Sequence, residues 1–374
     1  RSSSGTGTLR LHGDVNNKSG LLQYPGDHIF DINLEVVNSS VWSTGRDHSI
    51  DMVGKLQGSG SVTVSMTAAA EGYTAIILRQ ANPYSGDLII ENGHVELHHG
   101  NALQNAGVTV NRDQGLDLSE LNNQQVNIGA LAGTGNISMR NNDLKTTSDD
   151  DTTWSGDLSA FSTSQFTKAG TGRLTLSGSI NDIARLLNTG GGRVDITNDG
   201  TWGRLQSNGG TVDISSGAIV ELDSDLTNVF FLNGSGSATI KGGATVRLTG
   251  TAVDSPPRVV QTGTSQISVT DAGSQLTAPR IAVGPSVAGV SQFTASAGAT
   301  VSTSHLQIGD LGDDNGSSGS AIVQYDAALT ADLVTLYLRG SLSVYGGKVT
   351  TGQLVVNGST EVIRLTNGTF GAAL

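Results

Sequence analysis

Four copies of one short unit occur in ISVTDAGSQLTAPRIAV (267–283), QFTASAGATVSTSHLQI (292–308), IVQYDAALTADLVTL (322–336) and LSVYGGKVTTGQLVV (342–356). In each copy an apolar residue stands five positions before a short apolar segment: Leu276 before Ile281, Val301 before Leu306, Leu329 before Val334, and Val349 before Leu354. These markers lie 25, 28 and 20 residues apart, and the polar run from Asp310 to Ser320 accounts for most of the length variation. A constant core with one variable loop predicts a coil of stacked strands.

Apolar and polar residues alternate within each copy, as in Ile267-Ser268-Val269, so one face of every strand points inward. We align this segment with Gln292-Phe293-Thr294, Ile322-Val323-Gln324 and Leu342-Ser343-Val344. One copy has too little apolar surface to offset its ordering entropy, so it needs a copy above and below it. Stacked copies pair in parallel and bury a continuous apolar column. The sequence therefore predicts an all-β chain folded as a right-handed parallel β-helix, which is a solenoid.

The composition of the 374 residues fits one long solenoid domain, because a solenoid grows along one axis. The 51 glycines and only 36% apolar residues indicate many tight turns between short strands. Residues 1–54 are the least regular, and we expect them to cap the coil, which occupies residues 55–374. We expect loops near residues 141–153, 251–258 and 310–320. The best helical candidate, residues 181–188, is expected to be a local bulge.

The charge balance of 21 basic against 33 acidic residues gives a net charge of −12, which repels phosphate backbones and anionic membranes. Nucleic acid is therefore not an expected partner. The absence of cysteine excludes a disulfide framework and a thiol nucleophile. We find no signal peptide and no apolar run of about 18 residues. The abrupt start at Arg1 suggests a processed product, and the unclosed tail from Glu361 to Leu374 suggests that the natural protein continues.

Several segments resemble the autotransporter-associated β-strand repeat of passenger domains in bacterial type V secretion. The resemblance covers roughly Gly58 to Ile196 and rests on four pieces: NPYSGDLIIENGHVEL (82–97), NALQNAGVTV (101–110), GALAGTG (129–135) and KAGTGRLTLSG (168–178). The later copies resemble the looser repeats of the same group.

This resemblance implies a passenger of the AIDA type that is exported, threaded through a C-terminal outer-membrane barrel and folded at the bacterial cell surface. Neither the export signal nor the barrel is part of this sequence, so membrane attachment is expected only through such a barrel. Passengers of this kind are commonly adhesins. The expected partner is another copy on a neighbouring cell, which would promote aggregation and biofilm formation. The alternative partner is a host matrix protein or glycosaminoglycan.

Basic residues could carry the alternative function. Arg173, Arg193 and Arg204 each follow a glycine and open a strand, and Arg173 and Arg193 are 20 residues apart, about one turn. With Lys168 and Arg185 they could grip sulfated or carboxylated sugars. Neighbouring carboxylates would weaken this field, namely those of Asp182, Asp195 and Asp199.

Metal ligands are few. Asp310, Asp313 and Asp314 crowd one loop and are weak calcium candidates, and residues 149–151 form a second acidic run. His94, Glu96 and His98 alternate on one strand, but no other strand clearly offers a further ligand. A solvated strand face is the preferred interpretation, and we expect neither a metal nor a cofactor.

Catalysis is not expected. Polysaccharide-cleaving enzymes share the β-helix, and they need clustered carboxylates. Glu221, Asp223 and Asp225 are the nearest match. The recurring Gly-Thr-Gly and Gly-Ser-Gly pieces are each followed by a strand, whereas a phosphate-binding loop needs a helix there. We interpret them as turns.

Overall fold

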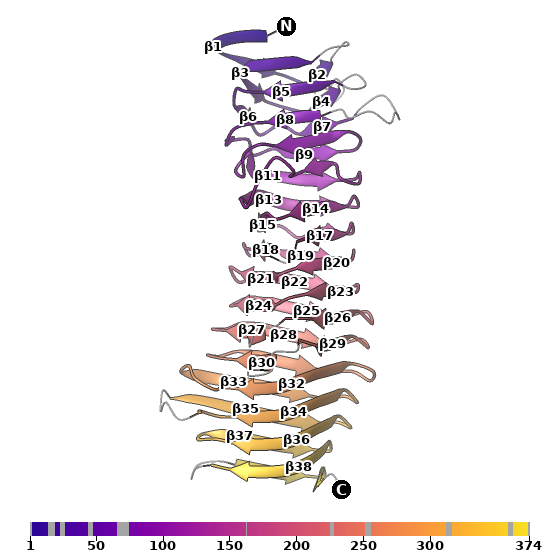
Figure 1. The fold of residues 1–374 in the computed structure, drawn as a ribbon, viewed down its shortest axis with the longest axis vertical. Helices are drawn as coiled ribbons and strands as arrows, with labels where there is room; N and C mark the ends of the chain where they lie inside the picture. Colours follow the sequence, from indigo (N-terminus) through magenta and orange to yellow (C-terminus); the bar gives the residue numbers. More distant parts are fainter. Residues whose placement is uncertain are drawn as a thin grey trace. The chain divides into compact units, whose positions relative to one another are not determined.

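The fold is an all-β parallel solenoid, as the sequence predicts. The computed structural model describes residues 2–13, 19–22, 27–43, 48–65, 75–161, 163–224, 228–250, 256–311, 316–357 and 362–372. None of these residues is helical. The chain divides into two compact units, Arg1–Asn181 and Asp182–Leu374, and β20 (Ile180–Ile183) contains the boundary. In each unit, successive turns of parallel strands lie one above another (Figure 1).

In the first unit, each strand pairs with the strand about one turn further along the chain. One sheet contains β1 (Ser2–Leu11), β3 (His28–Val36), β5 (Ser49–Met52), β6 (Leu56–Gly58), β8 (Ala75–Leu78), β10 (His94–Leu97) and β12 (Leu116–Asp117). The other strands are β2 (Ser19–Leu22), β4 (Ser40–Ser43), β7 (Val62–Val64), β9 (Asp87–Ile90), β11 (Leu103–Val110), β13 (Gln125–Gly133), β14 (Ile137–Arg140), β15 (Asp143–Thr146), β16 (Thr152–Trp154), β17 (Leu158–Ala160), β18 (Gln165–Lys168) and β19 (Arg173–Leu176).

The second unit has three sheets, which we number. Sheet 1 contains β22 (Arg193–Ile196), β25 (Thr211–Ile214), β28 (Ser237–Ile240), β31 (Gln266–Val269), β33 (Gly289–Ala295), β35 (Ser317–Gln324), β37 (Gly340–Tyr345) and β39 (Val362–Thr366).

Sheets 2 and 3 share four long strands, which bend from one sheet into the other. The shared strands are β32 (Gln275–Val283), β34 (Thr300–Ile308), β36 (Ala328–Leu336) and β38 (Lys348–Val356). Their first halves complete sheet 2, with β23 (Gly200–Trp202), β26 (Ile219–Leu222), β29 (Thr245–Leu248) and β40 (Thr369–Ala372). Their second halves complete sheet 3, with β21 (Arg185–Thr189), β24 (Leu205–Asn208), β27 (Asn228–Asn233) and β30 (Arg258–Gln261).

The four repeat copies stack in the register that the sequence predicts for their two main segments. Leu276 pairs with Val301 and so on to Val349, and Ile281 pairs with Leu306 and so on to Leu354. The alignment of the third segment was wrong by one residue in two copies. Ile267 is opposite Phe293, and Ala321 continues that inward row. Small Ala321 fills the core position while Ile322 points outward, so apolar character alone misplaced the register.

Three further sequence predictions need correction. Residues 141–153 are not a loop outside the coil: β15 and β16 form there, with Leu144 and Trp154 buried. Residues 181–188 belong to β20 and β21, so they are not a bulge. In the expected loop 310–320, strand β35 already begins at Ser317. Where described, residues 1–54, which we expected to cap the coil, form strands that pair in parallel with the next turns.

One corner of the first unit has the same construction on successive turns. The side-chain oxygens of Asp113, Asn136 and Asp157 each accept a hydrogen bond from a backbone N–H one turn later, at 3.0, 2.7 and 2.9 Å. Glycine precedes the last two acceptors, because the turns stack closely. A Cβ on Gly156 would lie 2.1 Å from the Gly135 carbonyl oxygen. The Asp and Asn side chains at this corner therefore bind the backbone of the next turn.

The segment that carries the family resemblance is structural as well. Asn82 is buried, accepts from the Leu56 N–H at 2.9 Å and donates to the Ala102 carbonyl at 3.1 Å. The buried Tyr84 hydroxyl donates to the backbone carbonyl of Gly60 at 2.8 Å. Burial raises the pKa of this phenol. This motif therefore joins successive turns and specifies the scaffold, not a ligand.

Candidate binding faces

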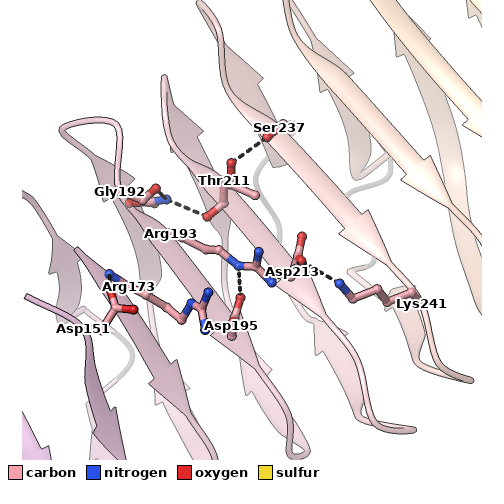
Figure 2. A network of polar contacts seen from close by, with 10 residues as sticks. Asp151, Arg173, Gly192, Arg193, Asp195, Thr211, Asp213, Ser237 and Lys241 are labelled. Carbon is pink, nitrogen blue, oxygen red and sulfur yellow. Dashed lines mark hydrogen bonds and ion pairs between the residues drawn. The ribbon is translucent and has the colours of Figure 1, made fainter. Parts of the chain in front are cut away.

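Arg193, a predicted partner-binding residue, is held in an ion-pair network on sheet 1 (Figure 2). Its guanidinium contacts Asp195 at 2.5 Å and Asp213 at 2.6 Å, and Lys241 contacts Asp213 at 2.9 Å. The hydrogen bond to Asp195 raises the pKa of Arg193. Two cations thus face two carboxylates, and this group offers no net positive charge to an anion.

Lys168, a second predicted partner-binding residue, is fully buried in the first unit. Its Nζ donates to three backbone carbonyls, those of Ser148, Ala169 and Gly170, at 3.1, 2.6 and 3.1 Å. Burial lowers the pKa of this ammonium. The side chain therefore stabilises stacked turns from inside and is not displayed on the surface.

The three remaining predicted arginines do not all belong to one unit. Arg173 is exposed in the first unit, where its backbone N–H donates to Asp151 at 2.9 Å. Arg185 and Arg204 lie in the second unit on adjacent turns of sheet 3, since Leu186 pairs with Leu205. Arg204 lies 5.5 Å from the centre of the Phe231 ring.

Sequence reasoning missed the continuation of these arginines along sheet 3. Arg258 pairs with Arg280, and Arg280 pairs with His305, at the outward position just before the buried segment of each strand. We call Arg258, Arg280 and His305 the basic column. The repeat alignment could have revealed this column, because Arg280 and His305 both stand directly before the aligned residues Ile281 and Leu306.

Of the three predicted calcium ligands, Asp310 is the one that lies in the described part of the chain. Asp310 is buried, and its carboxylate lies 4.0 Å from the Arg339 guanidinium. Asp313 and Asp314 lie outside the described residues. The placement of Asp310 beside a cation gives no support to a calcium site.

Residues from two parts of the chain gather around His98. Potential ligand atoms of Glu96, His98 and Glu120 lie within 4.8 Å of one another, and sequence reasoning missed Glu120. His94 points elsewhere, to the Gln114 carbonyl at 2.8 Å. The His98 Nδ1 lies 2.9 Å from a guanidinium nitrogen of Arg79, which can only donate. The His98 Nε2 must then carry the proton and donate to Glu96, so both ring nitrogens are engaged by the protein.

Two of the carboxylates considered for catalysis, Glu221 and Asp223, lie at the end of β26 (Ile219–Leu222). Glu221 is half-buried, and its carboxylate lies 4.0 Å from Arg247. Asp223 is exposed, and Asp225 lies outside the described residues. This arrangement does not identify a pair of carboxylates across a groove.

Sheet 2 displays a row of hydroxyl side chains. Thr277, Ser302, Thr330 and Thr350 occupy the same outward position on four successive turns. The first three are exposed and Thr350 is half-buried. We call these four residues the hydroxyl row. It is uncharged, and each hydroxyl can both donate and accept a hydrogen bond.

Comparison with family models, with curated proteins and with solved structures gave no match. In the part of the chain that the structure describes, no helix is long and apolar enough to cross a membrane.

Proposed function

We propose that this chain is a passenger segment of a bacterial surface protein, exported to the extracellular side, that mediates adhesion between cells by self-association. The hydroxyl row is the observation that carries this proposal. Its four members repeat at the strand spacing of about 4.8 Å, so two copies of the row can meet with matching periods.

A two-fold symmetric contact would place the hydroxyl row of one molecule against the same row of another. Each hydroxyl can donate to one partner and accept from another, so identical rows are complementary. A single hydrogen bond contributes only about 1 kcal/mol net, but contacts that form together add up. The row's neutrality matters, because a charged surface would repel its own copy.

Charge insertion tests this proposal. The variant Ser302→Asp with Thr330→Asp places like charges opposite each other in a symmetric contact, and we expect it to abolish self-association. Sedimentation velocity of the purified protein and aggregation of cells that display it are the measurements. Thr264→Asp with Gln266→Asp adds the same charge at exposed positions outside sheet 2 and should leave self-association unchanged. Equal self-association of both variants would contradict the assignment of self-association to the hydroxyl row.

A further inference from the structure

The basic column on sheet 3 is a second surface, separate from the hydroxyl row on sheet 2. Arg258, Arg280 and His305 lie on three consecutive turns. At about 4.8 Å per turn, the column spans roughly 10 Å. Arg185 and Arg204 occupy the equivalent position on two earlier turns of the same sheet.

The arginines of the column contact neutral amides, whereas Arg193 contacts carboxylates. The Arg258 Nε donates to the Asn228 side-chain oxygen at 2.8 Å, and the Arg280 Nε donates to the Gln307 side-chain oxygen at 2.5 Å. An amide oxygen fixes the direction of a guanidinium but does not neutralise its charge. Among described residues, the salt bridges with Asp or Glu involve other basic residues.

The pKa directions agree with this excess of positive charge. Burial and then the nearby Arg280 lower the pKa of Arg258, and the same two causes lower the pKa of His305. Burial and then Arg185 lower the pKa of Arg204. The guanidinium of Arg258 therefore lies close to that of Arg280, and the guanidinium of Arg204 lies close to that of Arg185, in a partly desolvated place where an anion would relieve their repulsion. His305, with its lowered pKa, is mostly uncharged at neutral pH and can donate or accept a hydrogen bond there.

We propose that the basic column binds a linear acidic polysaccharide that carries carboxylate or sulfate groups along its length. Guanidinium groups bind carboxylate and sulfate through paired hydrogen bonds. The amides of Asn228 and Gln307 and the half-buried ring of Phe231 lie on the same sheet. Sugar hydroxyls can use the half-buried amide of Asn228, and the C–H face of a sugar can pack on the ring. Gln307 is buried and holds the Arg280 guanidinium in place.

A phosphodiester backbone matches this surface less well. Its phosphates bind guanidinium groups but offer no C–H face that could pack on the Phe231 ring. Single-stranded nucleic acids are usually held by several stacked aromatic side chains. A polysaccharide uses both the charge and the neutral groups.

The test measures binding of fluorescently labelled heparin and polygalacturonate to the whole chain by fluorescence anisotropy at low salt. The column variant carries both Arg258→Gln and Arg280→Gln. We expect its affinity for at least one of the two polymers to fall about tenfold or more, because two charge-assisted contacts are lost. The control Arg247→Gln with Lys348→Gln removes the same charge from exposed positions on sheet 2 and should change affinity less than about twofold. Circular dichroism would establish that both variants are folded.

Three results would overturn the proposal. The first is equal affinity of the column variant and the control variant, and the second is no binding of either polymer to the unmodified chain. The third is tighter binding of a single-stranded oligonucleotide of matched charge, lost in the column variant, which would assign the surface to nucleic acid. Self-association is measured without any polymer and depends on sheet 2, so failure here leaves that function standing.

Discussion

Buried side-chain amides connect neighbouring turns at the residue scale. Asn142 is fully buried and accepts from the Gln124 N–H at 3.1 Å. It also donates to the carbonyls of Leu118 and Leu121 at 3.1 and 3.3 Å. One side chain thus forms hydrogen bonds with one backbone N–H and two backbone carbonyls.

Replacement of Asn142 by Ala should destabilise the first unit by about 2 kcal/mol, because buried backbone groups lose their partners. The midpoint of urea unfolding, followed by circular dichroism, measures the change. Asn141→Ala removes a neighbouring amide whose bond to Asn122 is exposed, so it should cost less than about 0.5 kcal/mol. Equal loss in both variants would contradict the bridging role.

The carboxylate of Asp149 gives a pH-dependent prediction. The Thr171 N–H and then the Thr171 hydroxyl, at 2.7 and 2.9 Å, lower its pKa below 3.8. A carboxyl whose pKa is lower in the folded state contributes stability above its unfolded pKa. That contribution is lost as pH falls through the folded pKa.

We therefore expect Asp149→Asn, which keeps the acceptor oxygen, to weaken the loss of stability below about pH 4. Thermal unfolding across a pH series is the measurement. Asp150→Asn removes the same charge at an exposed neighbouring position and serves as the control. If both variants follow the unmodified protein down to low pH, the Asp149 contact does not contribute.

Individual residues were the hardest scale to predict from the sequence. Alternation places Asp195 on the same face as Arg193, but only the register of sheet 1 brings Asp213 there as well. The burial of Lys168 was equally hidden, because the Ser148 carbonyl that its Nζ contacts comes from the preceding turn. An ion pair between two turns can be predicted only when the length of each turn is known.

Strands and corners were easier to predict at the element scale. Strands such as β19 and β22 were found because their inward residues are Leu, Val and Ile. β15 was missed because Leu144 is its only large apolar residue. Thr146 takes the second inward position, where its hydroxyl bonds to the Gly129 carbonyl at 3.0 Å.

The stacked glycines make a prediction for a whole corner. Gly156→Ala would put a methyl group 2.1 Å from the Gly135 carbonyl oxygen, where only backbone can yield. We expect a loss of about 2 kcal/mol or more, seen as a lower melting temperature. Gly7→Ala meets open space and should have almost no effect. Tolerance of Gly156→Ala would mean that the turns are less closely stacked.

Net charge governs association at the scale of the whole molecule. The chain carries −12, so two copies repel each other at low ionic strength. Self-association through the neutral hydroxyl row should therefore strengthen as salt rises from about 0.01 to 0.15 M. Binding of an acidic polysaccharide to the basic column should weaken over the same range.

Light scattering at several salt and protein concentrations measures the first trend, and fluorescence anisotropy measures the second. The two opposite trends separate the two surfaces in one protein. A monomer at every salt and protein concentration would remove self-association from the proposed function.

The corner at Asp113, Asn136 and Asp157 has a genetic consequence. Each acceptor serves the turn that follows it, so deletion of residues 136–156 would leave Asp113 facing the Asp157 N–H in place of the Asn136 N–H. Duplication of the same segment would add one more equivalent pair. Recombination between similar coding segments could thus change the number of turns without leaving this corner unsatisfied.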